Sequence, residues 1–138
     1  MFYDIVETAL DLEALARAVR GLESGALVTF VGYVRERSDE GRPVDGLHYE
    51  AHRELALAEL RVIGAEASER FGPARVAIVH RVGELALGEA AVAIAVAAAH
   101  RGVAFDACEY AIDELKKRVP IWKQERYVDG DASWRENT

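Results

Sequence analysis

Apolar residues recur along this chain with two periods, and the two periods predict interleaved strands and helices. Continuous or alternating apolar runs, typical of strands, cover six stretches: residues 2–6, 26–34, 46–51, 76–82, 90–99 and 121–128. Apolar residues three and four positions apart, typical of helices, cover three more: residues 11–21, 52–71 and 101–118. The pattern predicts one α/β or α+β domain over residues 1–138. Residues 90–99 are expected to form its central strand, and residues 26–34 a strand buried on both faces.

Capping residues and prolines mark the expected helix ends. Asp11 suits an N-cap and Gly21 a C-terminal end, and Gly72–Pro73 stops the second helix. Pro120 ends the third, because its ring clashes with a continuing helix. Three stretches are predicted to be irregular: a polar surface loop over 35–45, a turn over 85–89 and a polar tail over 129–138. The inward faces of the two longer helices are expected to carry Ala56, Leu60, Ile63, Ala67, Ala104, Ala107, Cys108, Ala111 and Leu115.

The composition is that of a soluble globular chain. Hydrophobic residues make up 51% and charged residues 30% of the 138 residues, and no uncharged apolar run is long enough to span a bilayer. The N-terminal MFYDIVETAL lacks the regions of a secretory signal, so a cytoplasmic location is expected. The formal net charge of −7 predicts no nucleic-acid or membrane partner. Any anionic ligand must therefore be small and held by a local cluster of cations.

Cations gather in the stretch KKRVPIWKQE, residues 116–125. Lys117 shares a helical face with Glu114 and is expected to be an ordinary surface cation. Lys116 follows Ile112 by four residues, at the margin of the apolar stripe, so its stem can pack while its amine points past the helix end. Partial burial and neighbouring cations both lower the pKa of an amine and free its lone pair for chemistry.

Other basic residues lie near the ends of predicted elements. Lys123 falls on a strand, where an exposed lysine is the alternative interpretation. His100 and Arg101 lie where a strand ends and a helix begins, and unpaired N–H groups there favour an anion. The alternative is a histidine bonded to the backbone beside a solvated arginine. Arg35 directly follows the strand over 26–34, and a simple surface role fits it equally.

The remaining reactive side chains predict neither a metal site nor a cofactor site. His80 alternates with apolar neighbours and is expected to be a core histidine. His48 and His52 straddle a strand–helix boundary, which disfavours a shared metal-binding face. Cys108 is the only cysteine and lies on an inward helical stripe, so it is expected to be an inert thiol. No glycine-rich phosphate loop is present.

Four segments together have a pattern specific to one protein family: GALVTFVGYVR (25–35), YEAH (49–52), IVHRVGELALGE (78–89) and AHRGVAFDACEYAIDELKKRVPIWKQE (99–125). The most specific part is His-Arg, a helix, and then K-x-R-x-P-x-W-K-x-E. In these segments the chain resembles the large, catalytic subunit of molybdopterin synthase over most of its length. It departs from the family in the loop over 36–45 and in a tail that is shorter and offset.

The resemblance implies an α+β fold of the hammerhead type, with mostly antiparallel strands. It implies an enzyme that transfers sulfur to a cyclic pterin monophosphate, forming the dithiolene of molybdopterin. The sulfur would arrive as a thiocarboxylate on the C-terminal glycine of a small ubiquitin-like subunit. This chain would form a homodimer within a heterotetramer that includes the small subunit.

By position, Lys116 and Lys123 match the two catalytic lysines of the family. We assign Lys116 to the thiocarboxylate end, as proton shuttle or oxyanion partner, and Lys123 to orienting the pterin, although the two roles are interchangeable at this stage. Arg135 is one candidate for an arginine that some members bring from a neighbouring subunit. The residues implied in substrate binding are Tyr33, Val34, Arg35, His100, Arg101, Lys116, Lys123, Gln124 and Glu125.

Two other functions would use these residues differently. A module that binds a phosphorylated small molecule, or the tail of a ubiquitin-like protein, would use the same cations without transferring sulfur. A purely structural partner of a ubiquitin-like protein would need an exposed apolar patch and would make no use of His100 or Arg101.

Overall fold

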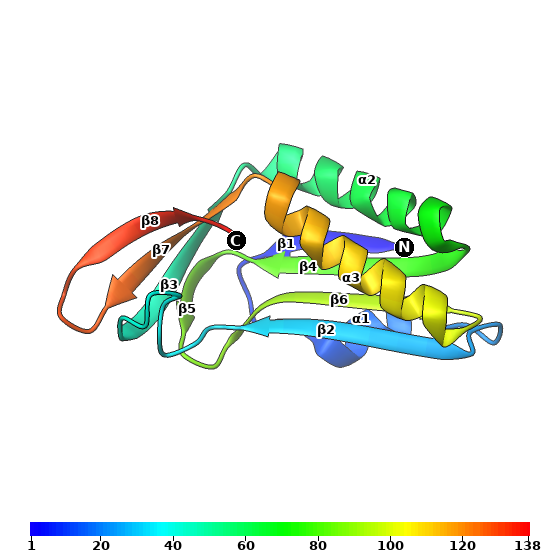
Figure 1. The fold of residues 1–138 in the computed structure, drawn as a ribbon, viewed down its shortest axis with the longest axis horizontal. Coiled ribbons are helices and arrows are strands. Elements are labelled where there is room, and N and C mark those ends of the chain that lie inside the picture. Colours follow the sequence, from blue (N-terminus) through cyan, green and yellow to red (C-terminus); the bar gives the residue numbers. More distant parts are fainter.

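Two four-stranded sheets and three helices make up the computed structural model, which describes residues 1–138 (Figure 1). The predicted α+β class is confirmed. None of the three helices combines the length and apolar character needed to cross a membrane. The elements follow in the order β1 (Phe2–Val6), α1 (Leu12–Val19), β2 (Ala26–Tyr33), β3 (Val44–Ala51), α2 (Arg53–Phe71), β4 (Ala74–Arg81), β5 (Gly83–Ala86), β6 (Ala90–Ala98), α3 (Arg101–Arg118), β7 (Ile121–Tyr127) and β8 (Ala132–Glu136).

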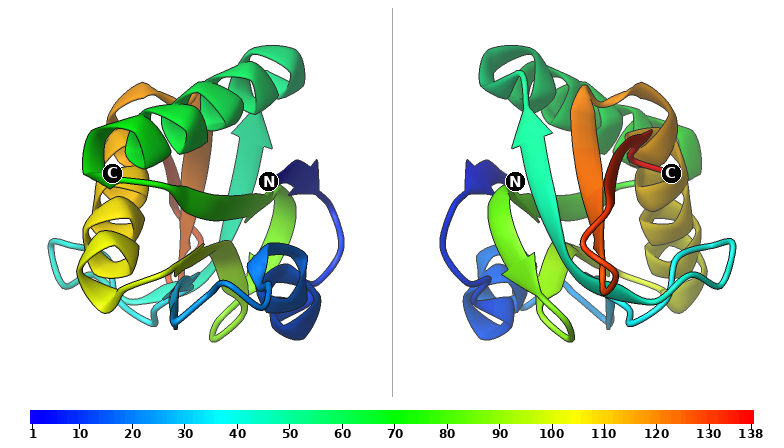
Figure 2. Two further views of the ribbon diagram at one scale, coloured as in Figure 1. Left: turned by 90° about the vertical axis from the view of Figure 1, so that its right-hand side faces the viewer. Right: turned by 90° about the vertical axis from the view of Figure 1, so that its left-hand side faces the viewer.

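The first sheet runs β1-β4-β6-β2 and is antiparallel except for the β1–β4 pair. Strand β6 lies inside the sheet, as predicted, and every residue after its first is buried. Helices α2 and α3 pack on one face through Ile78 and Ile94, and α1 packs on the other through Val79 and Ala93. Figure 2 shows these layers from both ends.

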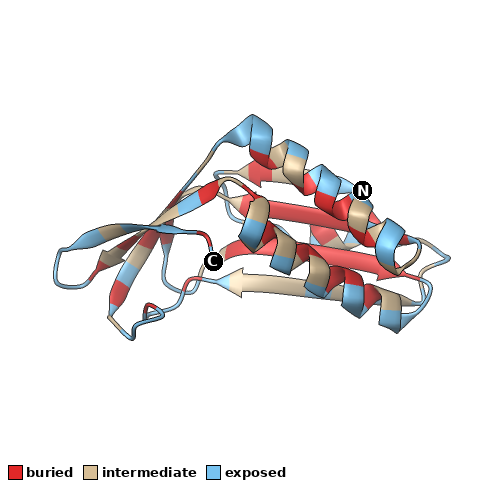
Figure 3. Cartoon of the chain, turned by 45° about the horizontal axis from the view of Figure 1, so that its top comes forward, coloured by how far each residue is buried: buried red, intermediate tan, exposed pale blue.

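The prediction that residues 26–34 are buried on both faces is wrong. Strand β2 is the edge of the first sheet, and most of its residues are only partly buried (Figure 3). Helix α3 covers one face of β2, whereas α1 packs on β4 and β6 instead. A continuous apolar run indicates burial only where both faces of a strand are covered. The outer edge of β2 is therefore unpaired in the single chain.

The second sheet runs β5-β3-β7-β8 and is antiparallel throughout. Two of its strands fall in stretches predicted to be irregular. Strand β5 overlaps the start of the predicted turn and forms by pairing with β3, and β8 forms in the tail by pairing with β7. Both strands depend on a partner strand rather than on their own apolar pattern, which explains why the sequence did not indicate them.

The helix ends follow the predicted capping chemistry closely. The Asp11 carboxylate accepts a hydrogen bond from Ala14 N at 3.0 Å, and α1 ends one residue before Arg20 rather than at Gly21. Helix α2 ends at Phe71, and its C-cap is Gly72, whose φ of 116° favours glycine. All nine predicted inward residues of α2 and α3 are buried. One core cluster of 26 residues joins both sheets to these two helices.

Candidate functional site

A polar recess of about 140 Å³ lies where the two sheets meet, at the C-terminal end of α3. Its walls come from the end of β2, the start of β6, strands β3 and β7, the segment after β2 and the last turn of α3. Four cations face it although the chain is acidic overall. We call it the cationic recess, and its lining residues are Gly32, Tyr33, Arg35, Arg37, Val44, Leu47, Tyr49, Ala91, Val92, Lys116, Lys123, Glu125 and Thr138.

Lys116 reaches the recess from the margin of the buried face of α3. Its amine donates a hydrogen bond to Asn137 Oδ1 at 2.9 Å. Burial, and then the charge of Lys123, lower the pKa of the Lys116 amine to about 8, against a smaller opposing effect of Asp39. About a tenth of this amine is therefore neutral at pH 7, far more than for an ordinary lysine, as expected from its place on the helix.

Lys123 enters the recess from the opposite wall, on β7. The break at Pro120 turns the chain from α3 into β7, so the last turn of the helix and the start of the strand face each other. Alternation along β7 then buries Ile121 and Glu125 and exposes Trp122, so Lys123 lies on the inward face. The two lysines thus meet across the recess because a helix and a strand join at a proline.

Arg35 lies at the mouth of the recess in an exposed ion pair. Its guanidinium contacts the Asp39 carboxylate at 2.6 Å. The hydrogen bond from Arg35, followed by the charge of Lys123, lowers the pKa of Asp39. An exposed pair of this kind contributes little to stability. An incoming anion can therefore replace the Asp39 carboxylate on Arg35 at small energetic cost.

Glu125 is the acidic residue inside the recess, and it is held by neighbours on the second sheet. Its carboxylate accepts a hydrogen bond from Tyr127 Oη at 3.0 Å and lies 3.4 Å from Arg135 Nε. Burial, with Glu125 as the second cause, raises the pKa of Tyr49 to about 12. Tyr49 therefore remains a neutral hydroxyl at physiological pH.

The structure brings five of the nine predicted site residues together. Tyr33, Arg35, Lys116, Lys123 and Glu125 all line the cationic recess.

The other four predicted residues lie elsewhere in the single chain. Val34 is buried beside the recess, and its N–H donates to Glu89 O at 2.9 Å. Gln124 lies on the opposite face of β7, where its Oε1 accepts from Arg126 Nε at 3.2 Å. His100 and Arg101 lie at the N-terminal end of α3 (Figure 1).

The His100–Arg101 pair is far from the recess within one chain. Arg101 begins α3 and Lys116 lies in its last turn. Fifteen residues of helix separate them by about 22 Å along the axis. A single chain therefore does not bring the pair to the lysines.

Several residues of the site gave little or no signal in the sequence. Arg37 and Asp39 lie in a loop without apolar periodicity, and Tyr49 is marked only by the YEAH segment. Asn137 follows a strand that the tail did not indicate. The Asp129–Gly130 dipeptide is typical of a hairpin turn, and it was the one signal in the sequence that could have predicted β8 and the position of Asn137 after it.

The predictions that His80 is a core histidine, Cys108 a buried thiol and Lys117 a surface cation are confirmed. His80 is fully buried with Nδ1 2.7 Å from Arg81 O, and burial lowers its pKa to about 4. Burial raises the pKa of Cys108 to about 11, so its thiol is unreactive. Lys117 is exposed and pairs with Glu114 at 3.4 Å. No group of three or more His, Cys, Asp or Glu side chains is arranged to hold a metal ion.

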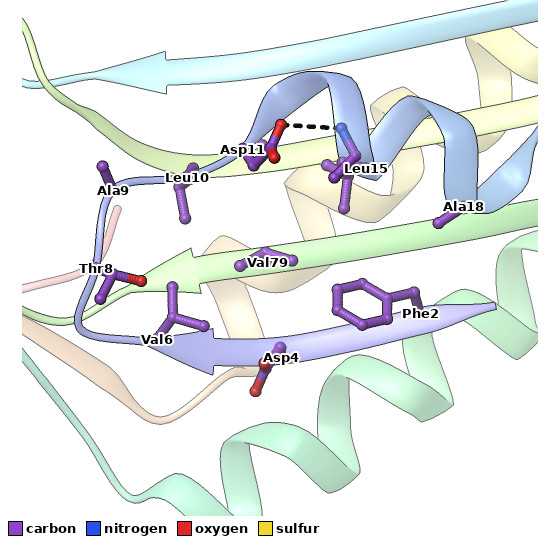
Figure 4. A pocket seen from close by; sticks show the side chains of 12 residues that line it. Phe2, Asp4, Val6, Thr8, Ala9, Leu10, Asp11, Leu15, Ala18 and Val79 are labelled. Atoms are coloured by element: carbon purple, nitrogen blue, oxygen red, sulfur yellow. Dashed lines mark hydrogen bonds between the residues drawn. The ribbon is translucent and has the colours of Figure 1, made fainter.

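A second cavity, of about 320 Å³, lies between β1 and α1 (Figure 4). Its walls are mostly apolar, with Phe2, Val6, Leu10 and Leu15 among them. The Asp11 carboxylate on its rim is engaged as the α1 cap. Its lining holds no cation, unlike that of the cationic recess, which is therefore the candidate site for chemistry.

The fold and the recess define an α+β domain with a pocket lined by four cations. The profile of the family described as MoaE protein matches residues 5–118. The molybdopterin synthase catalytic subunit of Bacillus subtilis (strain 168) is 45% identical over 129 residues, which cover 94% of this chain and 82% of the relative. The chain therefore belongs to the MoaE family, and the predicted membership and the prediction of an enzyme are confirmed.

Solved structures agree with this assignment. The X-ray structure of molybdopterin synthase from Staphylococcus aureus has a TM-score of 0.89 at 39% identity, covering 95% of this chain and 94% of that chain. A complex of subunits 1 and 2 of the molybdopterin-converting factor from Helicobacter pylori 26695 contains a chain with the same fold. That chain has a TM-score of 0.76 at 22% identity, with 97% of this chain and 90% of that chain covered.

Proposed function

We propose that this enzyme transfers sulfur from the thiocarboxylated C-terminus of a small ubiquitin-like carrier protein to a cyclic pterin monophosphate, forming the dithiolene of molybdopterin. Membership of the MoaE family supports the reaction class. The observation that carries the proposal is the partly buried amine of Lys116 in the same recess as Lys123 and Arg35.

Lys116 is the group suited to move protons in this reaction. Sulfur transfer from an acyl donor develops negative charge on the acyl oxygen and requires protons at sulfur and at the departing pterin oxygen. An amine with a pKa of about 8 can accept or donate a proton near neutral pH, whereas an ordinary lysine with a pKa of 10.5 stays protonated. Lys116 therefore acts as the proton shuttle or the oxyanion partner at the thiocarboxylate.

Lys123 and the two arginines suit the anionic pterin. Lys123 lies across the recess from Lys116, and Arg35 and Arg37 come from the segment after β2. Arginine recognises phosphate oxygens with two parallel hydrogen bonds. Lys123 would orient the pterin and its leaving oxygen, while the arginines would hold the phosphate near the mouth.

A polar cleft adjoining the recess suits the tail of the carrier. The cleft shares Lys123, Glu125 and Thr138 with the recess and continues past Glu40 and Arg135. A polar cleft that leads past Lys123 into the recess of Lys116 fits an extended peptide whose terminal carboxylate or thiocarboxylate reaches the two amines. The complex of two different subunits in the Helicobacter pylori structure is a precedent for such a partner in that protein.

A second copy of this chain would supply His100 and Arg101. Strand β2 has a free edge, and its two ends lie beside different parts of the site: Gly25 bonds to Ala98 next to His100, and Tyr33 leads into Arg35. Antiparallel pairing of β2 with β2 of the second copy would place the start of one strand beside the end of the other. Each recess would then receive the His100–Arg101 pair of its neighbour, as part of a homodimer with two carriers.

Reconstitution with purified carrier thiocarboxylate and the cyclic pterin precursor tests the proposed reaction. Product is followed by the mass gain of the pterin as sulfur enters. Lys116→Ala should lower the rate by on the order of 10²-fold or more, because the proton shuttle is lost. Lys117→Ala is the matched control, since its neighbour Glu114 and its exposure leave it outside the recess.

The outcomes separate the proposal from its alternatives. Loss of turnover in Lys116→Ala and Lys123→Ala, with carrier binding kept, supports sulfur transfer in this recess. Wild-type protein that binds the pterin tightly but never incorporates sulfur from a competent carrier would show a binding module instead. Full turnover by Lys116→Ala would remove the amine from the mechanism.

A further inference from the structure

A buried chain of hydrogen bonds leads from the Lys116 amine into the core. Asn137 is 3% exposed and lies between Lys116 and His80. Its Oδ1 accepts from Lys116 Nζ at 2.9 Å, and its Nδ2 lies 3.2 Å from His80 Nε2. His80 continues the chain to the carbonyl of Arg81 at 2.7 Å from Nδ1. A polar amide at this depth requires partners on both sides, and it has them.

The backbone carbonyl of Arg81 fixes which group donates and which accepts in every hydrogen bond of this series. The carbonyl of Arg81 can only accept, so His80 carries its proton on Nδ1. Nε2 of a neutral imidazole must then accept, and the pKa of about 4 keeps His80 neutral. The Asn137 amide therefore presents its NH₂ to His80 and its oxygen to Lys116.

The β7–β8 hairpin delivers Asn137 to this place. The pairs Trp122↔Glu136 and Lys123↔Arg135 set the register, so Asn137 comes directly after the last pair. Glu136, the last residue of β8, is exposed, whereas Asn137 turns into the core and is buried. The ring of Tyr49 packs edge-on against His80, at 5.0 Å between centroids, and closes the other side of the chain of bonds.

We propose that Asn137 is a positioning residue for the Lys116 amine, anchored through His80, and that it holds this amine as a donor without adding a charge beside it. The consequence for turnover rests on the proposed function. One hydrogen of the amine points to Asn137, so the remaining hydrogens or the lone pair face the recess. A carboxylate at position 137 would also hold the amine but would favour its charged form.

The charges around Lys116 come from every wall of the recess. Lys123 lowers the pKa of the amine and Asp39 raises it. A neutral acceptor leaves this balance undisturbed, since an amide carries a dipole but no net charge. The titratable or charged groups that face Lys116 are Lys123 and Glu125 on β7, Tyr49 on β3, His80 on β4, and Arg35, Arg37 and Asp39 on the segment after β2.

Competitive acetylation of the isolated chain tests the contact without carrier or pterin. Trace acetic anhydride is applied from about pH 6 to about pH 11, and acetylation of Lys116 and Lys117 is read by peptide mass. Asn137→Asp should raise the pKa of Lys116 by about one unit or more, because a carboxylate stabilises the ammonium. The curve of Lys117 should not move. An unchanged Lys116 curve in folded Asn137→Asp would overturn the proposal.

A measurement on the wild-type chain keeps the test valid if that variant does not fold. The side-chain ¹H–¹⁵N signals of Asn137 should shift with pH along the Lys116 titration, and Lys116→Ala should abolish the shift. Signals that stay fixed while Lys116 titrates would also overturn the proposal.

Activity then reports on the proposed function separately. In the reconstituted enzyme, the pH–rate profile of Asn137→Asp should move to higher pH by the same amount as its Lys116 titration. If the pKa of Lys116 shifts in Asn137→Asp but the pH–rate profile does not, the contact between Asn137 and Lys116 is supported. The role of Lys116 in turnover is then contradicted.

Discussion

Lys116 shows which properties of a single site residue can be predicted from local sequence. Its place four residues after Ile112 predicted a stem on the apolar margin and an amine with a lowered pKa, and the structure agrees. Asp39 and Asn137, which complete its surroundings, come from other elements and could not be paired with it by spacing. A residue's own burial is thus readable from periodicity, whereas its neighbours across the fold are not.

The balance of charges around Lys116 gives a prediction in two directions. Lys123→Ala should raise the pKa of Lys116, because a nearby cation that disfavours the ammonium is removed. Asp39→Asn should lower it, because a nearby anion is removed. Each shift should be of the order of half a unit to one unit, measured by the same competitive acetylation. Shifts of the same sign in both variants would contradict the arrangement.

At the scale of elements, the sequence predicted all three helices and most strands, because their apolar faces and caps are local. Helix α3 was predicted with both of its ends, Arg101 and Arg118. Strands β5 and β8 were missed, because each exists through pairing with a neighbour in the second sheet. The edge position of β2 was also missed, since an apolar run does not show which strands will flank it.

The junction between β2 and β6 gives a stability prediction. A Cβ added at Gly25 would lie 2.2 Å from the carbonyl oxygen of Ala99, a backbone atom that cannot move aside cheaply. Gly25→Ala should therefore destabilise the protein by about 1–3 kcal/mol, measured by denaturant unfolding.

Gly102→Ala is the matched control for Gly25→Ala. Nothing lies within 4 Å of its Cβ position in the first turn of α3, so the change should be neutral or stabilise by up to about 1 kcal/mol. Equal destabilisation by both variants would contradict the close approach at Gly25.

At the scale of the whole molecule, one core joins the two sheets and buries a neutral histidine at their junction. The pKa of His80 is about 4 in the folded chain and 6.5 ordinarily, with burial as the main cause. Below pH 6.5 the unfolded chain therefore binds more protons than the folded one, and stability falls as the pH is lowered toward 4. The loss should reach about 2–3 kcal/mol in denaturant unfolding followed across this range.

The carboxylates contribute little to the pH dependence of stability between pH 6.5 and 4.5. The groups whose pKa is lowered in the fold, such as Asp39 and Glu114, have ordinary values of 3.8 and 4.5, so their contribution is lost mainly below pH 4.5. His80→Gln should be less stable at neutral pH but should show a flatter dependence between pH 6.5 and 4.5. A wild-type stability that is constant across that interval would contradict the buried neutral imidazole.

The assembly of the complete site also belongs to this scale. Four cations of the recess come from one chain, and the His100–Arg101 pair lies at the far end of α3. Sequence resemblance predicted that pair and three of the four cations, all but Arg37, for one site, but no local pattern shows whether they meet within a chain or between two. The free edge of β2 is the structural reason to expect two.

Subunit mixing tests most directly the claim that basic residues from two chains meet in one recess. Lys116→Ala and Arg101→Ala are each prepared as inactive protein, mixed under conditions that exchange subunits, and assayed for sulfur incorporation; native mass spectrometry measures the fraction of mixed dimers. In an equal mixture with random exchange, about half of the dimers contain one subunit of each variant. Each mixed dimer has one intact and one doubly altered recess, so activity should return to about a quarter of the wild-type value. Absence of recovery despite confirmed mixed dimers would contradict the shared recess.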